Sequence, residues 1–175
     1  MIHVDQLLEA DRIHHETWMQ EALKEADKAL VLDEVPIGAV LVYQGQIVGR
    51  GHNVRESQER ALGHAELMAI ETANQQLGHW RLEEASLYVT LEPCPMCAGA
   101  LMNCRIKEVI YGASDLKAGC AGTLMNLLEE DRFNHRAQVI QGVLEQECSH
   151  KLSQFFKDLR QRKKMSKARQ TEHKE

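Results

Sequence analysis

Three residues of the types that bind zinc stand in two short segments of the chain. Cys94 and Cys97 form a Cys-x-x-Cys pair in PCPMC, and His64 opens the upstream segment HAE. Such a cysteine pair can close a disulfide, exchange thiols or bind a metal. Two thiolates and an imidazole are ligands that zinc prefers, and a site with three protein ligands keeps a position open for water, which is typical of catalytic zinc.

Glu66 follows His64 by two residues. Side chains two residues apart on a helix point to nearly opposite sides, so both reach one ion only if the ion lies off the N-terminus of the helix. Glu66 then reaches a water molecule rather than the metal, and a carboxylate there can accept a proton and return it. The alternative is an acidic side chain that only favours the positive end of a helix.

The other three cysteines are expected to pack in the core. Cys104 follows Cys97 by seven residues, about 10 Å along a regular helix, so the two thiols cannot share one zinc ion. Cys120 and Cys148 receive the same interpretation, because free cysteine is commonly buried. The total of five cysteines is odd, which is unusual for a disulfide framework.

Length and composition fit one globular domain. The chain has 175 residues, of which 43% are hydrophobic and 27% charged. Acidic residues in the first eleven positions argue against a secretory signal, and no apolar run is long enough for a membrane span. We therefore expect a cytoplasmic protein with reduced thiols and no membrane contact.

Hydrophobic patterning predicts alternating strands and helices. The expected strands are residues 36–43, 46–53, 86–90, 108–113 and 137–142. The expected helices are residues 14–32, 64–77, 94–104 and 123–130, with a last amphipathic helix from residue 144. This order predicts a three-layer α/β/α sandwich around a mixed five-stranded sheet. Ligands of such sheets bind where strands end and helices begin, which is where we expect His64 and Cys94.

The charge is unevenly distributed. Residues 157–175 carry eight Lys or Arg and three Asp or Glu, a net of +5, whereas the whole chain has a net charge of −5. We therefore divide the chain into a domain at residues 1–156 and a basic C-terminal helix end or tail at 157–175. A basic end is either a solvated helix terminus or a contact for a polyanion such as RNA.

These segments carry a family resemblance. HAE followed by PCPMC resembles the H-x-E…P-C-x-x-C signature of the zinc-dependent nucleoside and nucleobase deaminases. The segments EVPIGAVLV, HAELMAI, LYVTLEPCPMCAGAL and RIKEVIYGASD resemble the bacterial tRNA-specific adenosine deaminases. The resemblance extends over residues 16–156, and the surrounding segments favour this tRNA branch of the superfamily.

The resemblance implies a cytidine-deaminase-like fold and the hydrolytic conversion of adenosine to inosine at the wobble position of a tRNA anticodon loop. It implies one Zn²⁺ per subunit, bound by His64, Cys94 and Cys97, and a proton shuttle at Glu66. Zinc would activate the water that replaces the amine on C6 of adenine. The resemblance places substrate contacts at Pro36, Asn53, Ala65, Asp115 and Phe156.

The resemblance also implies a homodimer, whose contact would use the apolar faces around Leu101 and Met102. Two departures from the family concern the edge of the pocket. His52 stands where some relatives have an aromatic ring, and the segment ERALG before His64 differs from the usual approach.

Other classes of protein share parts of the pattern. A deaminase of free cytidine, deoxycytidylate or guanine would have the same catalytic core. A non-catalytic, zinc-stabilised RNA-binding module would not require Glu66, and a Cys-x-x-Cys redox protein would leave HAE unexplained. The segment VGRGHNV lacks the third glycine of a dinucleotide-binding loop.

Overall fold

The structure is a computed structural model that describes residues 1–172, and side chains are described for residues 1–166. A short 3-10 turn at Val4–Gln6 precedes the first long helix. The strands are β1 (Ile2–His3), β2 (Gly38–Tyr43), β3 (Gln46–His52), β4 (Ala85–Leu91), β5 (Glu108–Ala113) and β6 (Gln138–Gln141). The helices are α1 (Glu9–Val31), α2 (Ala65–Leu77), α3 (Pro95–Asn103) and α4 (Glu145–Glu172).

The six strands form one mixed sheet in the order β1-β6-β5-β4-β2-β3. Strands β4, β5, β6 and β1 are parallel, while β2 runs antiparallel to both β3 and β4. The predicted mixed sheet is confirmed, but the predicted number of strands is wrong. The additional strand, β1, has two residues and pairs Ile2 with Ile140, and a segment that short has no readable alternation.

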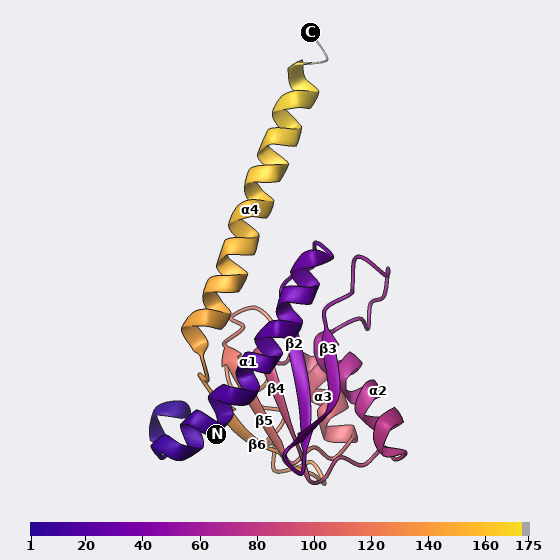
Figure 1. The fold of residues 1–175 in the computed structure, drawn as a ribbon, viewed down its shortest axis with the longest axis vertical. Helices are drawn as coiled ribbons and strands as arrows, with labels where there is room; N and C mark the ends of the chain where they lie inside the picture. The colour runs from indigo at the N-terminus through magenta and orange to yellow at the C-terminus, as the bar shows by residue number, and fades with distance from the viewer. Residues whose placement is uncertain (173–175) are drawn as a thin grey trace.

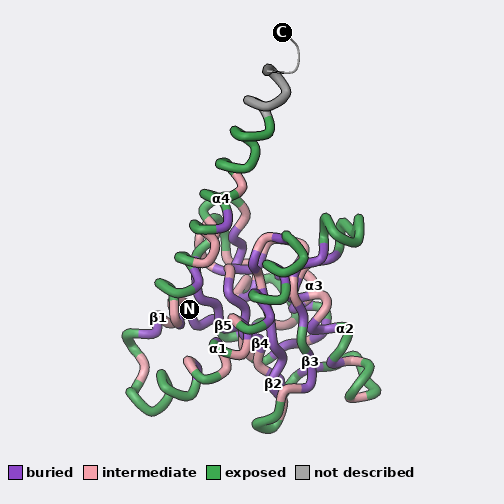
Figure 2. Tube along the Cα trace, turned by 45° about the horizontal axis from the view of Figure 1, so that its top comes forward, coloured by how far each residue is buried: buried purple, intermediate pink, exposed green. Residues whose placement is uncertain are grey.

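Helices cover both faces of the sheet, so the predicted α/β/α sandwich is confirmed (Figure 1). Alternating residues along each strand point to opposite layers. In β2, Ala39 and Leu41 pack in the core beneath α2 and α3, whereas Val40 and Val42 pack in the core beneath α1 and α4. Figure 2 shows that burial is concentrated in the strands and the inward faces of the helices.

Two predicted elements differ from the structure. Helix α1 begins at Glu9, five residues before its predicted start. Residues 123–130 do not form the predicted helix but a series of turns, with a bridge between Ala121 and Asn126. The N–H of Leu127, which a helix would bond to the carbonyl of Thr123, donates to the carbonyl oxygen of Cys120 at 3.0 Å. The residues at the start of the segment are held by Glu92, which accepts from the N–H groups of Ala121 and Thr123, so contacts outside the segment override its local apolar spacing.

Helix α4 begins on the sheet and continues beyond the body of the protein (Figure 1). It runs unbroken across residue 157, where the predicted basic segment begins. The loop after β3, the C-terminal end of α1 and the projecting half of α4 all lie at the same end of the body. None of the helices within residues 1–172 combines the length and apolarity that crossing a bilayer requires.

Candidate zinc and nucleoside site

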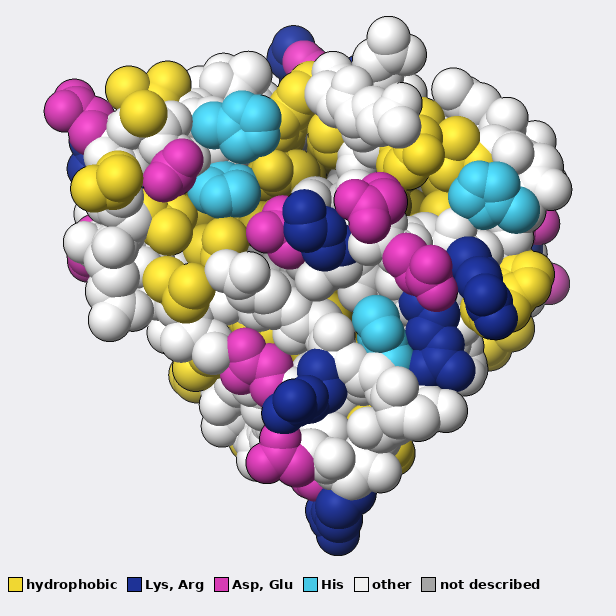
Figure 3. Space-filling view, turned by 90° about the horizontal axis from the view of Figure 1, so that it is seen from below, with side chains coloured by type: hydrophobic (Ala, Val, Ile, Leu, Met, Phe, Trp, Pro, Cys, Tyr) yellow, Lys and Arg dark blue, Asp and Glu magenta, His cyan; other side chains and the backbone are white. Residues whose placement is uncertain are grey.

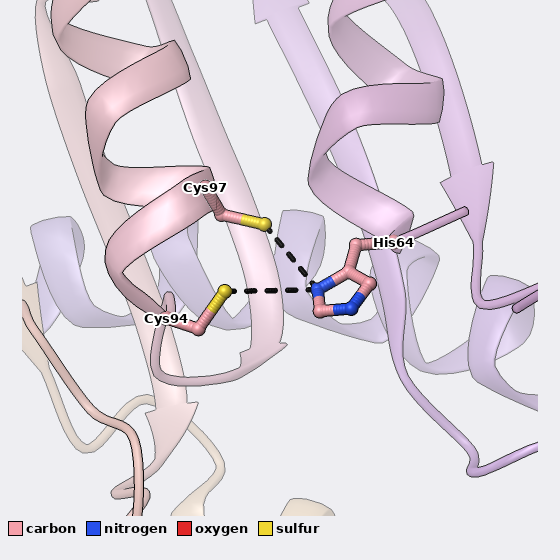
Figure 4. A group of neighbouring side chains, drawn as sticks. All are labelled: His64, Cys94 and Cys97. Atoms are coloured by element: carbon pink, nitrogen blue, oxygen red, sulfur yellow. Dashed lines mark hydrogen bonds between the residues drawn. The ribbon is translucent and has the colours of Figure 1, made fainter. Parts of the chain in front are cut away.

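Two helix N-termini bring the predicted zinc ligands together. His64 is the N-cap residue of α2, and Cys94 is the N-cap residue of α3, with Pro95 at the first helical position. The prediction that each residue opens a helix is therefore confirmed. N-cap side chains commonly bond to their own helix, but neither of these does. Instead, both point with Cys97 into the space between the two helices (Figure 4).

The three side chains stand at distances that suit one tetrahedral zinc ion. His64 Nδ1 lies 3.7 Å from Cys94 Sγ and 3.5 Å from Cys97 Sγ. Ligands at zinc–sulfur and zinc–nitrogen distances of about 2.3 and 2.0 Å, separated by a tetrahedral angle, are about 3.5 Å apart. The three ligand atoms lie within 4.8 Å of one another. This donor set and its spacing fit zinc, with Nδ1 as the nitrogen ligand.

Cys104 does not belong to this group. It caps the C-terminus of α3, is 6% exposed, and its thiol lies 3.3 Å from the carbonyl oxygen of Leu101. Cys120 and Cys148 are buried as well, as the sequence predicted. Within the described residues, all five cysteines are free thiols.

Close approach and burial shift the pKa values at the site. The hydrogen bond with Cys97, together with His64, lowers the pKa of the Cys94 thiol to about 4. The same contact with Cys94, together with burial, raises the pKa of Cys97. Contact with Cys94 raises the pKa of His64, and burial raises the pKa of Glu66 to about 7. One thiol is therefore readily ionised, as a zinc ligand must be, and Glu66 has the properties of a general acid–base group.

A pocket of about 130 Å³ opens beside these residues. It is lined by Ile37, Asn53, His64, Ala65, Glu66, Leu91, Glu92, Cys94, Asp115 and Ala118. Of the predicted substrate contacts, Asn53, Ala65 and Asp115 lie in its wall. The pocket is small, so it suits the reacting part of a nucleoside rather than a large ligand.

Two other predicted contacts lie elsewhere. Pro36 is buried just before β2, and its neighbour Ile37 lines the pocket instead. Phe156 is 41% exposed on α4 and packs edge-to-face against Phe155, which is buried. Their role as substrate contacts stays a prediction. His52 lies outside the pocket wall, with Nδ1 3.4 Å from a carboxylate oxygen of Glu25.

Two buried carboxylates flank the pocket, and neither was singled out from the sequence. Glu34 accepts a hydrogen bond of 3.0 Å from Asn53 Nδ2. Glu92 accepts from the backbone N–H groups of Asp115, Ala121 and Thr123 at 2.9–3.0 Å, and from the hydroxyl of Thr123. An acidic residue inside an otherwise apolar segment, as in EVPIG and TLEPC, is the available sequence signal, because such a residue is rarely buried without partners.

Comparison with known proteins agrees with this geometry. Residues 13–160 match the model of the MafB19-like deaminase family. The chain is 58% identical to the tRNA-specific adenosine deaminase of Bacillus subtilis strain 168, over 87% of this chain and 94% of that protein.

Two solved structures have similar folds. One comes from work on A-to-I editing by tRNA:A34 deaminases at the wobble position of transfer RNA. It has a TM-score of 0.74 and 40% identity, over 78% of this chain and 99% of the other. A guanine deaminase from B. subtilis has a TM-score of 0.56 and 37% identity, over 62% and 70% of the two chains. This chain belongs to the MafB19-like deaminases and, within them, to the family of the bacterial tRNA-specific adenosine deaminases.

Proposed function

We propose that this protein is a cytoplasmic, zinc-dependent hydrolase that converts adenosine to inosine at position 34 of a tRNA anticodon loop. The observation that carries the proposal is the convergence of His64, Cys94 and Cys97 at the side of a small pocket that is also lined by Glu66. The similarity to tRNA-specific adenosine deaminases across most of the chain supports the choice of substrate.

Each residue of the pocket has a separate role in the proposed deamination. A bound zinc ion would lower the pKa of a water molecule so that it attacks at neutral pH. Glu66 is 4% exposed and faces the same space, where its carboxyl group takes the proton of the water and passes it to the ring and the departing amine. Asn53 and Asp115, which both line the pocket, hold the base and the ribose. Ala65 lies in the first turn of α2, where its N–H points toward developing negative charge.

Helix α4 supplies a basic surface for the RNA. Five Lys or Arg side chains of its projecting half are exposed: Lys157, Arg160, Arg162, Lys163 and Lys164. The projecting half of α4 lies at the same end of the body as the loop after β3, which leads to His64 (Figure 1). On the end that faces away from the tip of α4, positive and negative side chains are interspersed (Figure 3). The basic residues predicted beyond 166 lie outside the described side chains. We propose that the α4 cations contact phosphates and that Phe156 contacts the loop.

A homodimer forms part of the proposal. Leu101 is 0% exposed and packs within the core of one chain, so it cannot itself reach a partner. Met102 is 9% exposed and lines a hollow with Gly99, Asn103, Leu127 and Phe133, of which Phe133 is 49% exposed. This surface is the candidate for the contact, and sedimentation of wild type and Phe133→Asp tests it.

The alternative substrate class is a free base or nucleoside. The similarity to a guanine deaminase supports this alternative, since the two chains have similar folds and are 37% identical over the part that aligns. The exposed basic half of α4 favours RNA, because a small uncharged base gains nothing from it.

One experiment separates these functions. Zinc-loaded protein is incubated with an anticodon stem-loop, total tRNA, free adenosine, cytidine and guanine, and inosine is mapped in the RNA. We expect inosine at the wobble position and at least about 100-fold less turnover of free substrates, because RNA contacts position the base. Glu66→Gln should keep one zinc per chain and abolish inosine. Turnover of free cytidine or guanine with an unmodified stem-loop contradicts the proposal.

A further inference from the structure

The segment between α1 and β2 places a carboxylate behind the pocket wall. Glu34 is 1% exposed, and its backbone N–H donates to the carbonyl oxygen of Ala29 at 3.0 Å, which attaches it to the end of α1. It does not line the pocket itself. A buried carboxylate destabilises a fold unless hydrogen bonds satisfy it, so its partners show what it holds in place.

Both carboxylate oxygens of Glu34 accept hydrogen bonds. Oε1 accepts from the backbone N–H of Ser57 at 2.6 Å and from the Ser57 hydroxyl at 2.8 Å. Oε2 accepts from Asn53 Nδ2 at 3.0 Å. Hydrogen bonds to a charged acceptor are stronger than neutral ones, so this arrangement fixes both partners firmly.

The contact decides which way the Asn53 amide points. A carboxylate only accepts, so the amino group of Asn53 must face Glu34 and its carbonyl oxygen must face elsewhere. The backbone N–H of Asn53 is bonded to Ile37 O at 3.0 Å, which fixes the main chain as well. Within the described residues no donor bonds to Oδ1, and Oδ1 is not among the buried atoms without a partner. Since Asn53 lines the pocket, Oδ1 is an acceptor available to a ligand.

Ser57, the second hydrogen-bond partner of Glu34, connects this carboxylate to the loop before the zinc ligand His64. Ser57 lies in the exposed loop between β3 and α2, whose base is closed by a hydrogen bond of 2.9 Å from Val54 N to Gly63 O. His64 follows directly. One buried side chain therefore fixes the amide on the pocket wall and the loop that leads to the metal site.

We propose that Glu34 is a positioning residue of the deamination site, which orients the Asn53 amide so that the pocket presents a hydrogen-bond acceptor and selects nucleosides with an N–H or O–H donor at that wall. The donor is either the exocyclic amine of the base or a ribose hydroxyl. This inference rests on the proposed function for its substrate.

The test compares wild type, Glu34→Gln and a matched control, Glu108→Gln. Glu108 is a half-buried carboxylate that accepts from Ser86 Oγ at 2.8 Å. It lies at the start of β5, whereas the pocket lies at the other end of the strands, where Leu91 of β4 pairs with Ala113 of β5. A glutamine at position 34 can donate as well as accept, so it no longer dictates how Asn53 points. We expect Glu34→Gln to raise KM for an adenosine stem-loop about tenfold with kcat and zinc content nearly unchanged, and Glu108→Gln to change neither.

Two modified stem-loops identify the donor. One carries 2′-deoxyadenosine at the target position, and the other carries a purine ribonucleoside without the amine and is measured as a competitive inhibitor. Glu34→Gln should weaken binding, seen as a higher KM or inhibition constant, for the analogue that keeps the donor. It should leave binding of the analogue that lacks the donor unchanged. An unchanged KM in Glu34→Gln, or an equal penalty with both analogues, overturns the proposal.

A readout without turnover separates this inference from the proposed function. Hydrogen exchange of the Asn53 side-chain amide, followed by NMR, should be slow in wild type and in Glu108→Gln but fast in Glu34→Gln. Fast exchange in wild type overturns the positioning role. If wild type leaves the stem-loop unmodified, the proposed function fails, while the exchange result still decides whether Glu34 holds Asn53.

Discussion

Gly51 of β3 lies against the first turn of α2 so closely that a Cβ atom there would overlap the carbonyl oxygen of Ala65. Ala65 follows His64 and precedes Glu66. The absence of a side chain at Gly51 therefore sets the height of the zinc ligand and the proton shuttle above the sheet.

Gly51→Ala should weaken zinc binding about tenfold or more, because it pushes His64 away from Cys94 and Cys97, and supporting contacts of metal ligands typically matter by this amount. Zinc affinity is measured by competition with a chelator. Gly38→Ala is the matched control, since a Cβ there would overlap Ala22 of α1 on the other face of the sheet. Gly38→Ala should lose stability and keep its zinc affinity. Wild-type affinity in Gly51→Ala would contradict the account.

Cys97→Ala should lose zinc, whereas Cys104→Ala should keep one zinc per chain and lose only about 1 kcal/mol of stability from a small cavity. The physical reason is that Cys97 Sγ faces His64, while Cys104 is buried at the far end of α3. Elemental analysis of both variants gives the zinc content per chain, and thermal unfolding gives the loss of stability. Loss of zinc from Cys104→Ala would show that the ligand set is wrong.

Glu92→Gln should loosen the loop that carries Asp115. Glutamine replaces one acceptor oxygen with a donor, so some of the N–H groups of Asp115, Ala121 and Thr123 lose their partner, at about 1–3 kcal/mol for each group left unsatisfied. We expect faster amide exchange at Ala121 and Thr123, a higher KM for the stem-loop and unchanged zinc. Unaltered exchange at these two amides would argue that the loop is held by other contacts.

The chemistry of the site was readable from the sequence because it depends on residue types at fixed spacing. His64 and Cys94 each stand at a position where the local pattern starts a helix, and the structure confirms both helix starts, with Cys97 in the first turn of the second helix. The strands β2 to β6 were found for the same reason, since their β-branched runs are local.

What could not be read depends on contacts between distant segments. The turns at residues 123–130 have apolar residues at helical spacing, but the N–H groups of Leu124 and Leu127 donate to the carbonyl oxygens of Gly119 and Cys120, and that of Thr123 donates to Glu92. The orientation of Asn53 depends on Glu34, nineteen residues away in sequence. No local pattern reports that a carboxylate will be buried opposite a particular amide.

We expect His15 to make the fold sensitive to acid. Its ring is 9% exposed, Nδ1 lies 3.0 Å from the hydroxyl of Tyr88, and burial lowers its pKa. The unfolded chain, with a histidine pKa of about 6.5, then binds the proton more readily than the folded one. Stability is therefore retained above pH about 6.5 and falls below it, by up to about 1.4 kcal/mol per pH unit. Denaturant unfolding of wild type and His15→Gln between pH 5.5 and 7.5 measures the free energy of unfolding as a function of pH. The same pH dependence in both proteins would exclude His15 as the cause.

The zinc ligands come from two separate strand–helix units, β3–α2 and β4–α3, so the unfolded chain has no preformed site. Metal binding and folding are therefore linked by mass action. Free zinc at 100 times its dissociation constant would add about 2.7 kcal/mol to the apparent stability, and a chelator would remove it. The ion that activates water would thus also fasten two neighbouring crossover units of the sheet to each other.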